Sequence, residues 1–428
     1  MCLETGPRHT IKAHGDAHAD GHAHQQGYLT ASTQRIAAEQ SNNYRQENNE
    51  YCHWDNGDER MGYLYFFFHL NVFLCFDCAN IQIIDGLCRF HYHFYYFCSK
   101  IQTDMTQSMI RLSRWLAGNA SLFIIAIAVL TFFLPDLFAW VRGTTQTVIL
   151  GIIMLTMGLT LTTDDFRILA RRPLDILLGT CAQFFIMPCV AYLLVRVFHL
   201  EPALALGILL VGCCPGGVSS NIMSYLCHGD VAFSVGMTCA STLLAPVMTP
   251  MLMQITAGEI IEIDAIGMFL NILIVTIIPV GIGCFLNYTY SKNKHFPTIQ
   301  SLMPGLSVIC LACIVGGVIS TVHDDLIARG LWLFLWTFAV VFCHNTMGYI
   351  LGYTAGRVAG LTKAKKRTIS IEVGMQNAGL ATVLAGNFFA AQPLAVLPCA
   401  ISCAWHSISG TILAGIFLRF DKKTKQAC

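Results

Sequence analysis

The sequence CCPGGVSSN at residues 213–221 interrupts a long apolar run, and EVGMQNAG at residues 372–379 interrupts another. Proline removes a backbone N–H donor and glycine weakens a helix, so we expect both stretches to be unwound. At membrane depth, unwound backbone is tolerated only where it is buried in protein or lines a water-filled cavity. The two stretches therefore predict two broken helices inside a membrane-embedded bundle.

The composition of the chain indicates the same class of protein. Of its 428 residues, 55% are hydrophobic and only 12% are charged, whereas a soluble domain carries about 25% charged residues. The formal net charge is +1 and no region forms a basic domain, which argues against nucleic-acid binding. We predict an all-α integral membrane protein and exclude a cytosolic enzyme and a disordered chain.

Ten apolar segments follow one another at nearly regular intervals from Ala117 onward. Each is at least 19 residues long, which is enough for a helix to cross a hydrocarbon core of roughly 30 Å. The expected spans are residues 118–140, 144–162, 173–198, 203–226, 230–256, 264–287, 301–322, 330–356, 366–390 and 393–418.

The charges of the connecting segments predict the orientation of these spans. If the first span starts on the cytoplasmic side, sixteen Lys and Arg residues fall in cytoplasmic segments, whereas only Arg142, Arg196 and Arg329 fall outside. Cytoplasmic loops of membrane proteins carry an excess of Lys and Arg. We therefore expect a multi-pass protein of the inner or plasma membrane, with both ends of residues 105–428 in the cytoplasm.

The two interrupted spans occupy matching positions, the fourth and the ninth of the ten. Spans 1–5 and 6–10 then form two five-helix repeats. Because five is an odd number, the second repeat must insert upside down relative to the first. Paired interruptions in corresponding helices of inverted repeats are typical of secondary transporters with a binding site near the bilayer midplane. The pattern predicts a transporter.

Glu372 is the only carboxylate that we expect in the bilayer interior. An ionised carboxylate there costs about 2.5–3.5 kcal/mol on insertion scales, so it needs a counter-ion. Since no Lys or Arg is expected nearby, a cation held by oxygen ligands is the natural partner; the alternative is a protonated, hydrogen-bonded Glu372. Ser234 and Thr238, four residues apart on one helical face, and Gln183 are candidate ligands. Each alone is more often a helix–helix hydrogen-bonding residue.

Four motifs carry a resemblance to a known family. Residues 215–221 read PGGVSSN, residues 229–234 read GDVAFS, residues 241–246 read STLLAP, and residues 370–377 read SIEVGMQN. In this order they resemble the signatures of the bile acid:sodium symporter family, in a bacterial-type member, with coverage of residues 110–418. The resemblance implies ten helices, with spans 3–5 and 8–10 in a core domain and spans 1, 2, 6 and 7 in a panel domain.

The resemblance also implies binding residues. The family binds two sodium ions where the interrupted helices cross, and by positional match the first ion would be bound by Ser220, Asn221, Ser234, Thr238 and Glu372. The second would be bound by Gln183, Glu372, Gln376 and the backbone carbonyls of Val373 and Met375. The family's organic anion lies between core and panel, where the candidates are Gly217, Ser219, Asn377 and His406. A neutral His406 packed in the core is the alternative.

The resulting prediction is a sodium-coupled symporter that imports an organic anion by alternating access. The expected substrate is a small carboxylate such as pantoate or a 2-oxo acid, or a bile salt. We expect two Na⁺ as coupling ions and no other cofactor, transition metal, nucleic acid or obligate protein partner. One alternative is a proton-coupled carboxylate transporter in which Glu372 carries the proton. An intramembrane enzyme using Cys213, Cys214 or His406 lacks a catalytic motif, and a sensor lacks an output domain.

Residues 1–104 differ in composition from the rest of the chain. Residues 1–60 are polar and have no apolar periodicity, which is typical of disorder. Residues 61–98 are rich in aromatic side chains, but polar residues interrupt them too often for a membrane span. We expect a poorly structured extension without a function of its own. One interpretation is that translation begins at Met105 or Met109 and that the upstream residues come from an over-extended reading frame.

Overall fold

The computed structural model of the chain is helical throughout the part that it describes. This part comprises residues 100, 105–162, 165, 167 and 173–427, and all of it belongs to one compact unit, Phe97–Cys428. The extension expected over residues 1–104 lies outside the described residues, Lys100 excepted. Within the described part, the β-structure consists of one isolated bridge.

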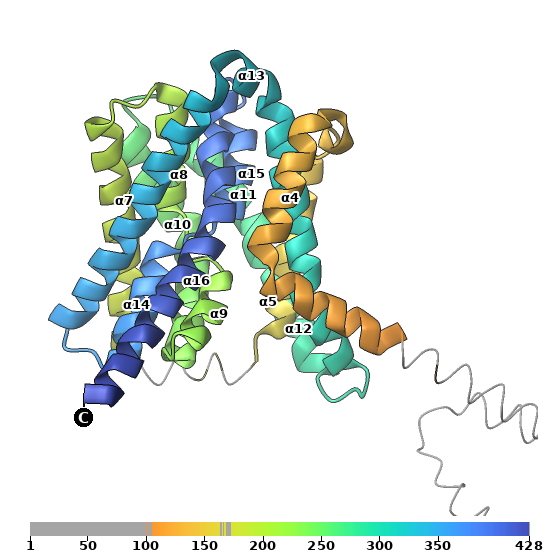
Figure 1. Cartoon of the computed structure of the whole chain (residues 1–428). Coiled ribbons are helices and arrows are strands. Elements are labelled where there is room, and N and C mark those ends of the chain that lie inside the picture. Colours follow the sequence, from red (N-terminus) through yellow and green to blue (C-terminus); the bar gives the residue numbers. More distant parts are fainter. Residues whose placement is uncertain (1–99, 101–104, 163–164, 166, 168–172, 428) are drawn as a thin grey trace, which may run out of the picture. The chain divides into compact units, whose positions relative to one another are not determined.

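The first five expected spans contain seven helical elements (Figure 1). The fourth span is interrupted as predicted, because α8 ends at Cys213 and α9 begins at Ser219. The elements are α4 (Ala120–Phe133), the 3₁₀-helix η2 (Pro135–Phe138), α5 (Thr144–Thr160), α7 (Pro173–Val197), α8 (Pro202–Cys213), α9 (Ser219–Leu226) and α10 (Val231–Ala257).

The last five expected spans contain eight elements, and the ninth span is interrupted between Gly374 and Ala378. The elements are α11 (Ala265–Ile272), the π-turn η3 (Leu273–Ile277), α12 (Ile278–Tyr290), α13 (Phe296–Val358), α14 (Lys363–Gly374), α15 (Ala378–Phe388), the 3₁₀-helix η4 (Pro393–Ala395) and α16 (Val396–Ala427).

Two boundaries differ from the sequence-based expectation. We expected a loop between residues 322 and 330, and this prediction is wrong. The helix continues through these residues to a kink at Gly330, where φ is +68°. Glycine adopts this backbone conformation without the steric penalty of a side chain, so one residue turns the chain. The first expected span is also shorter than predicted: α4 ends at Phe133, and the preceding helix Met105–Gly118 meets it at 81°.

Five of the described helices are individually long and apolar enough to cross a membrane. They are Pro173–Val197, Val231–Ala257, Ala265–Tyr290, Phe296–Val358 and Pro393–Asp421, and the bent pair Met105–Gly118 and Ala120–Phe133 makes a sixth if counted as one span. The 63-residue helix α13 covers two of the expected spans. The shorter α8 and α15 are parts of the two broken spans.

Helix α8 lies inside the bundle among α7, α10, α15 and α16. Every residue from Ala203 to Cys213 is buried, as expected for a helix that is apolar on all sides. Because α8 ends where the fourth span breaks, the buried helix fixes that break inside the protein. Beside this bundle, α5 packs against α12, and both α4 and α5 pack against α13 (Figure 1).

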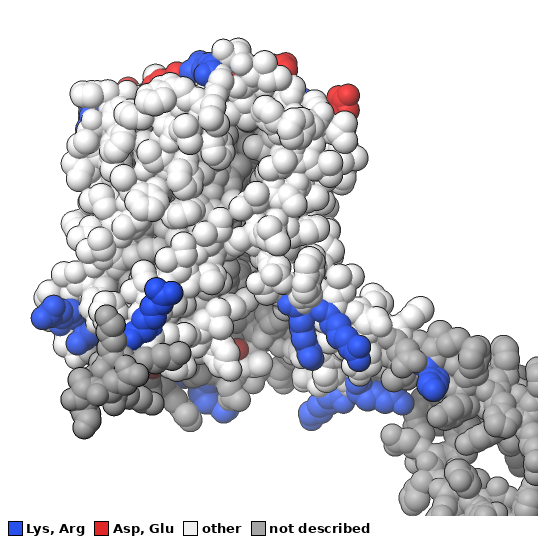
Figure 2. Space-filling model, in the orientation of Figure 1, with Lys and Arg blue, Asp and Glu red and all other residues white. Residues whose placement is uncertain are grey.

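The two ends of the helical unit differ in charge. Figure 2 shows most of the visible Lys and Arg side chains gathered at the end where the C-terminus lies, and acidic side chains at the opposite end. The apolar surface between them includes exposed side chains such as Leu174, Phe185 and Ile266. This distribution is that of a multi-pass membrane protein, with an apolar belt between two polar ends.

Helices α5 and α12 are held together by a glycine contact. A Cβ atom at Gly283 would lie 2.5 Å from the carbonyl oxygen of Leu155, and one at Gly158 would lie 2.2 Å from that of Val280. Since real Cβ atoms do not approach so closely, the two backbones touch directly. Small residues at such positions are the usual basis of close helix packing in membranes.

We predict that Gly283→Ala lowers the apparent Tm of the purified protein in detergent, because overpacking a tight contact costs about 1–3 kcal/mol. Gly281→Ala, on the same helix, is the matched control, since a Cβ atom there meets no other atom within 4 Å. Thermal unfolding of the two variants side by side measures the effect. Equal Tm values for both would contradict the direct backbone contact.

Candidate functional site at the two helix interruptions

The two interruptions pair with each other. The Gly217 amide donates a hydrogen bond to the Met375 carbonyl at 2.8 Å, and the Asn377 amide donates one to the Pro215 carbonyl at 2.8 Å. Gly216 and Gln376 form the antiparallel bridge between them. Each unwound segment therefore satisfies backbone groups that the other segment lost with its helix, as buried backbone requires.

Side chains from intact helices form hydrogen bonds with further backbone groups that the interruptions leave without helical partners. Thr249 Oγ1 donates to the carbonyl of Cys213 at 2.8 Å, and Asn345 Nδ2 donates to the carbonyl of Gly374 at 2.7 Å. The Gly216 amide donates to Ser241 Oγ at 3.2 Å. None of the three was predicted as a site residue, although Ser241 belongs to the family motif at residues 241–246; Thr249 and Asn345 appear in the sequence only as polar residues within apolar helices.

Glu372 lies at the centre of a buried hydroxyl cluster. Its carboxylate accepts hydrogen bonds from Ser220 Oγ at 2.6 Å, from Thr238 Oγ1 at 3.0 Å and from Ser234 Oγ. All four side chains are fully buried. The structure therefore brings together four of the five residues predicted for the first cation site, from helices α9, α10 and α14.

Asn221, the fifth residue of that set, has no hydrogen bond to Glu372. Its Oδ1 atom is buried and has no hydrogen-bond partner among the described residues. Ser224, one turn further along α9, has its Oγ atom 3.1 Å from Ser234 Oγ and joins the cluster. Sequence reasoning missed Ser224, although it follows Ser220 by four residues on the same helix and so shares its face.

The residues predicted for the second cation site adjoin the first. Gln183 Nε2 donates to Gln376 Oε1 at 3.1 Å, and Gln376 Nε2 donates to the Val373 carbonyl at 2.6 Å. Gln183 Oε1 is buried and lacks a partner within the described part of the chain. A Cβ atom at Gly216 would lie 3.4 Å from this oxygen and 3.0 Å from Glu372 Oε2, so both oxygens face the same glycine.

The carbonyls predicted as ligands already have donors. The Val373 carbonyl accepts from Gln376, and the Met375 carbonyl accepts from Gly217. Since a carbonyl oxygen has two lone pairs, each keeps one for a further partner. Carboxylate, hydroxyl, amide and carbonyl oxygens are the donor set that hard cations prefer, and no Lys or Arg contacts Glu372 among the described residues. The chemistry of the site therefore fits a cation.

A cavity of about 410 Å³ adjoins the paired interruptions. Gly217, Ser219, Asn377 and His406 all line it. Its other walls are largely apolar and come from α4, α5 and the first part of α13, with Leu150, Met154, Met157, Met303 and Leu311 among the lining residues. The four residues predicted to contact an organic anion thus share one cavity between the two groups of helices.

The charges of this cavity are unusual for an anion site. Asp165 is the only acidic or basic residue among its described lining residues other than His406, and sequence reasoning missed it. The Asp165 carboxylate accepts hydrogen bonds from the amide and the hydroxyl of Thr162, at 2.7 and 2.8 Å. Without a Lys or Arg, the backbone N–H groups at the starts of α9 and α15 are the groups suited to bind an anion.

The position of His406 is compatible with both alternatives stated for it, a contact to the anion and a histidine packed in the core. It lines the cavity, but it is also 97% buried, and its Nδ1 atom lies 3.2 Å from the carbonyl oxygen of Gln376. Its Nε2 atom has no partner within the described residues. Since the Gln376 carbonyl is only an acceptor, Nδ1 carries a proton and His406 supports the second interruption.

The cysteines considered for an intramembrane enzyme pack elsewhere. Cys213 and Cys214 are fully buried in the main hydrophobic cluster, and neither is among the described residues that line the cavity. The Sγ atom of Cys213 lies 3.8 Å from the hydroxyl of Thr256. A thiol in these surroundings is a packing residue, because a nucleophilic cysteine needs partial exposure and a positive environment.

Comparison with known proteins places this chain among membrane transporters. Residues 147–329 match the model of the Sodium Bile acid symporter family. The chain is 39% identical over 317 residues to an uncharacterized sodium-dependent transporter, YocS, of Bacillus subtilis, with coverage of 74% of this chain and 96% of that protein.

Two further relatives are eukaryotic. The probable chloroplastic sodium/metabolite cotransporter BASS1 of Arabidopsis thaliana is 40% identical over 289 residues, which are 68% of this chain and 70% of the relative. The human ileal sodium/bile acid cotransporter is 34% identical over 287 residues, 65% of this chain and 79% of the relative. All three relatives are named as transporters and none as an enzyme.

We predict that Gly216→Ala weakens cation binding, because the added methyl group occupies the space beside Glu372 Oε2 and Gln183 Oε1. The measurement is the rise in Tm of the purified protein in NaCl relative to KCl at the same ionic strength, which ligand binding to the folded state produces. We expect this rise in the unaltered protein and its loss in the variant.

Gly379→Ala provides the control for this measurement, since a Cβ atom there would make only ordinary contacts, the nearest at 3.5 Å. It should keep the sodium-specific rise in Tm. An undiminished rise in Gly216→Ala would show that the oxygens facing this glycine do not bind the ion.

Proposed function

We propose that this chain, which belongs to the sodium bile acid symporter family, is a sodium-coupled secondary transporter that imports an organic anion. The observation that carries the proposal is the buried carboxylate of Glu372, which accepts hydrogen bonds from three hydroxyl groups beside two paired helix interruptions. A charge in such a place needs a counter-ion. The surrounding oxygen atoms make a sodium ion the suitable one.

We assign the helical unit to ten membrane spans in two inverted five-helix repeats. Helices α7–α10, α14–α16 and the second part of α13 form the core domain, and α4, α5, α11, α12 and the first part of α13 form the panel domain. We place the protein in the plasma or inner membrane, with both ends of residues 105–428 in the cytoplasm. The gathering of Lys and Arg side chains at the end where the C-terminus lies supports this orientation.

One sodium ion binds within the hydroxyl cluster. Ser220, Ser234 and Thr238 supply hydroxyl oxygens and Glu372 supplies the negative charge, all from within one network of hydrogen bonds. Asn221 completes the set through its buried Oδ1 atom, which is without a partner among the described residues. When the ion enters, the hydroxyl protons turn away from the carboxylate, and the hydroxyl oxygens face the ion.

A second sodium ion binds next to it, on the side of Gln183. The unpartnered Oε1 atom of Gln183 and the second carboxylate oxygen of Glu372 both face Gly216. Gln376 and the free lone pairs of the Val373 and Met375 carbonyls complete this site. Since Glu372 serves both ions, the two positions share one charge, and occupation of one alters the other.

The organic anion binds in the adjoining cavity. Its carboxylate accepts hydrogen bonds at the starts of α9 and α15, near Gly217, Ser219 and Asn377, and its apolar part contacts the panel side. A cavity of about 410 Å³ accommodates a small carboxylate such as pantoate or a 2-oxo acid with room for water. The apolar panel side is also compatible with a bile salt.

Transport then follows from movement of the core domain against the panel domain. Sodium neutralises Glu372 and orders the paired interruptions, and these form the polar wall of the anion cavity. The loaded core moves so that the cavity opens to the other side of the membrane. Each net positive charge carried across 100 mV contributes about 2.3 kcal/mol, so two sodium ions with a monovalent anion make uptake concentrative.

We predict that Glu372→Ala abolishes sodium-dependent uptake while the protein still reaches the membrane, because the variant lacks the only charge in the hydroxyl cluster. Uptake into cells, normalised to the amount of protein in the membrane fraction, measures this. Glu259→Ala is the control, since this carboxylate is exposed and pairs with Arg196 at 3.0 Å. Sodium-stimulated uptake that survives in Glu372→Ala would remove the coupling model.

The substrate class and the coupling ion are tested together in proteoliposomes. Labelled pantoate or taurocholate is supplied with an inward gradient of sodium or of potassium at fixed pH. We expect accumulation with sodium only, and the accumulated compound identifies the substrate class. Equal uptake in both salts that responds instead to a pH gradient would favour the proton-coupled alternative, with Glu372 as the proton carrier.

A further inference from the structure

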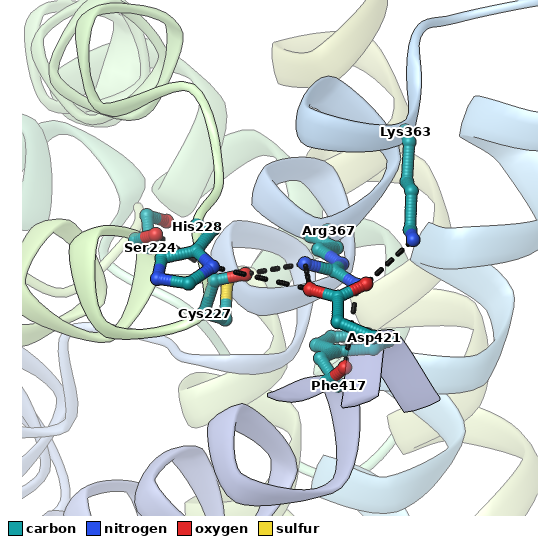
Figure 3. A network of polar contacts seen from close by, with 7 residues as sticks. All are labelled: Ser224, Cys227, His228, Lys363, Arg367, Phe417 and Asp421. Carbon is teal, nitrogen blue, oxygen red and sulfur yellow. Dashed lines mark hydrogen bonds and ion pairs between the residues drawn. The ribbon is translucent and has the colours of Figure 1, made fainter. Parts of the chain in front are cut away.

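A second polar network, around Arg367 and Asp421, involves residues near the C-terminal end of α16 (Figure 3). Arg367, on α14, is 97% buried. Its guanidinium group donates to Asp421 Oδ1 at 2.6 Å and to Asp421 Oδ2 at 2.8 Å. It also donates to the carbonyl oxygens of Cys227 at 2.8 Å and Phe417 at 3.3 Å. We call Arg367, Asp421 and these two carbonyls the clasp.

The clasp joins residues of, or directly next to, three helices: α9, α14 and α16. Cys227 directly follows α9, Arg367 lies on α14, and Phe417 and Asp421 lie near the end of α16. Lys363 adds a further hydrogen bond to Asp421 at 2.5 Å. The Asp421 carboxylate therefore has two cationic hydrogen-bond donors, Arg367 and Lys363.

Helices α9 and α14 are thereby tied together at both of their ends. At the interruptions, Ser220 near the start of α9 donates to Glu372 near the end of α14. Beyond the other end of α9, Arg367 of α14 donates to the carbonyl of Cys227, the residue that follows α9. The two short helices run in opposite directions between these contacts. Sliding of α14 along α9 would break hydrogen bonds at both places.

The distance between the two ends is short. Arg367 precedes Glu372 by five residues, which is about 7.5 Å along a helix. A single helical segment of this length transmits a shift or rotation at Arg367 directly to the Glu372 carboxylate. The hydroxyl groups of Ser234 and Thr238 belong to α10, whose start is linked to α14 by the hydrogen bond from the Asp230 amide to Thr368 Oγ1, at 2.9 Å.

We propose that the clasp is a positioning device for the cation site: Arg367 and Asp421 hold α14 against α9 in the register that places Glu372 among its hydroxyl ligands, and so determine sodium affinity without touching the ion. The proposal rests on the proposed sodium coupling. A planar guanidinium group that binds a carboxylate in bidentate fashion is suited to this, because it fixes orientation as well as distance.

The decisive variant is Asp421→Asn, which keeps the shape of the side chain but removes its charge and weakens the bidentate pair. We expect the sodium concentration that gives half-maximal uptake to rise by about three- to tenfold, the size of effect that residues coupled to a distant site produce. At saturating sodium, the anion concentration for half-maximal uptake should stay unchanged. A residue with a merely structural role would lower the amount of protein in the membrane and leave both concentrations as they are.

Two further variants, one graded and one a control, complete the test. Lys363→Met removes one outer partner of Asp421 and leaves His228, whose Nδ1 atom lies 3.9 Å from Asp421 Oδ2, so it should shift the sodium requirement in the same direction but less. Glu201→Gln is the matched control, because it neutralises the bidentate pair of Glu201 with Arg329, at 2.7 Å for both oxygens, outside the clasp. It should leave the sodium requirement unchanged. Sodium-specific stabilisation of the purified variants provides a second measure that does not depend on transport.

The outcomes separate this proposal from the proposed function. If the unaltered protein shows neither sodium-dependent uptake nor sodium-specific stabilisation, sodium coupling itself fails, and the clasp proposal falls with it. If the unaltered protein depends on sodium and both Asp421→Asn and Lys363→Met keep its half-saturating sodium concentration, the clasp proposal alone is overturned. An equal shift in Glu201→Gln would also overturn it, since the effect would then be general.

Discussion

Every other feature of the site depends on the mutual hydrogen bonding of two unwound backbone segments. Pro215 and Gly217 on one segment, and Met375 and Asn377 on the other, exchange the groups that a continuous helix would have satisfied within itself. In a bilayer no solvent is available for this task. The pairing therefore permits two helices to be open at the same depth, and the open helices present Ser220 and Glu372 to one another.

Glycine is required at the centre of this pairing for reasons of space. At Gly216 a side chain would meet Glu372 and Gln183, and at Gly217 it would meet the backbone of Gln376 at 2.8 Å. Side-chain oxygen atoms of Glu372 on α14 and Gln183 on α7 thus both lie beside the backbone at Gly216. The arrangement concentrates acceptor oxygens around one buried carboxylate, which is an unfavourable arrangement without a positive partner. In the proposed function, the sodium ion is this positive partner.

The sequence predicted the local features well and the distant contacts poorly. The interruptions at residues 213–221 and 372–379 were readable because proline and glycine act on the helix in which they lie. The four-residue spacing of Ser234 and Thr238 marked them as candidate ligands, but the grouping of both with Ser220 and Glu372 came from the family resemblance. The partners of Thr249, Asn345 and Arg367 could not be read from local sequence, since each contact joins residues that are 29 or more positions apart. The helical continuation to Gly330 was missed because a single glycine replaced the expected loop.

The pairing of the two interruptions also sets a condition on how the protein is made. Gly216 and Gln376 are 160 positions apart in the chain, and synthesis at about 5–20 residues per second separates them by roughly 10–30 s. During that interval the first interruption is already synthesised while its partner is not. Until residues 374–378 have been made, its backbone groups need other hydrogen-bond partners, because buried backbone groups must be paired.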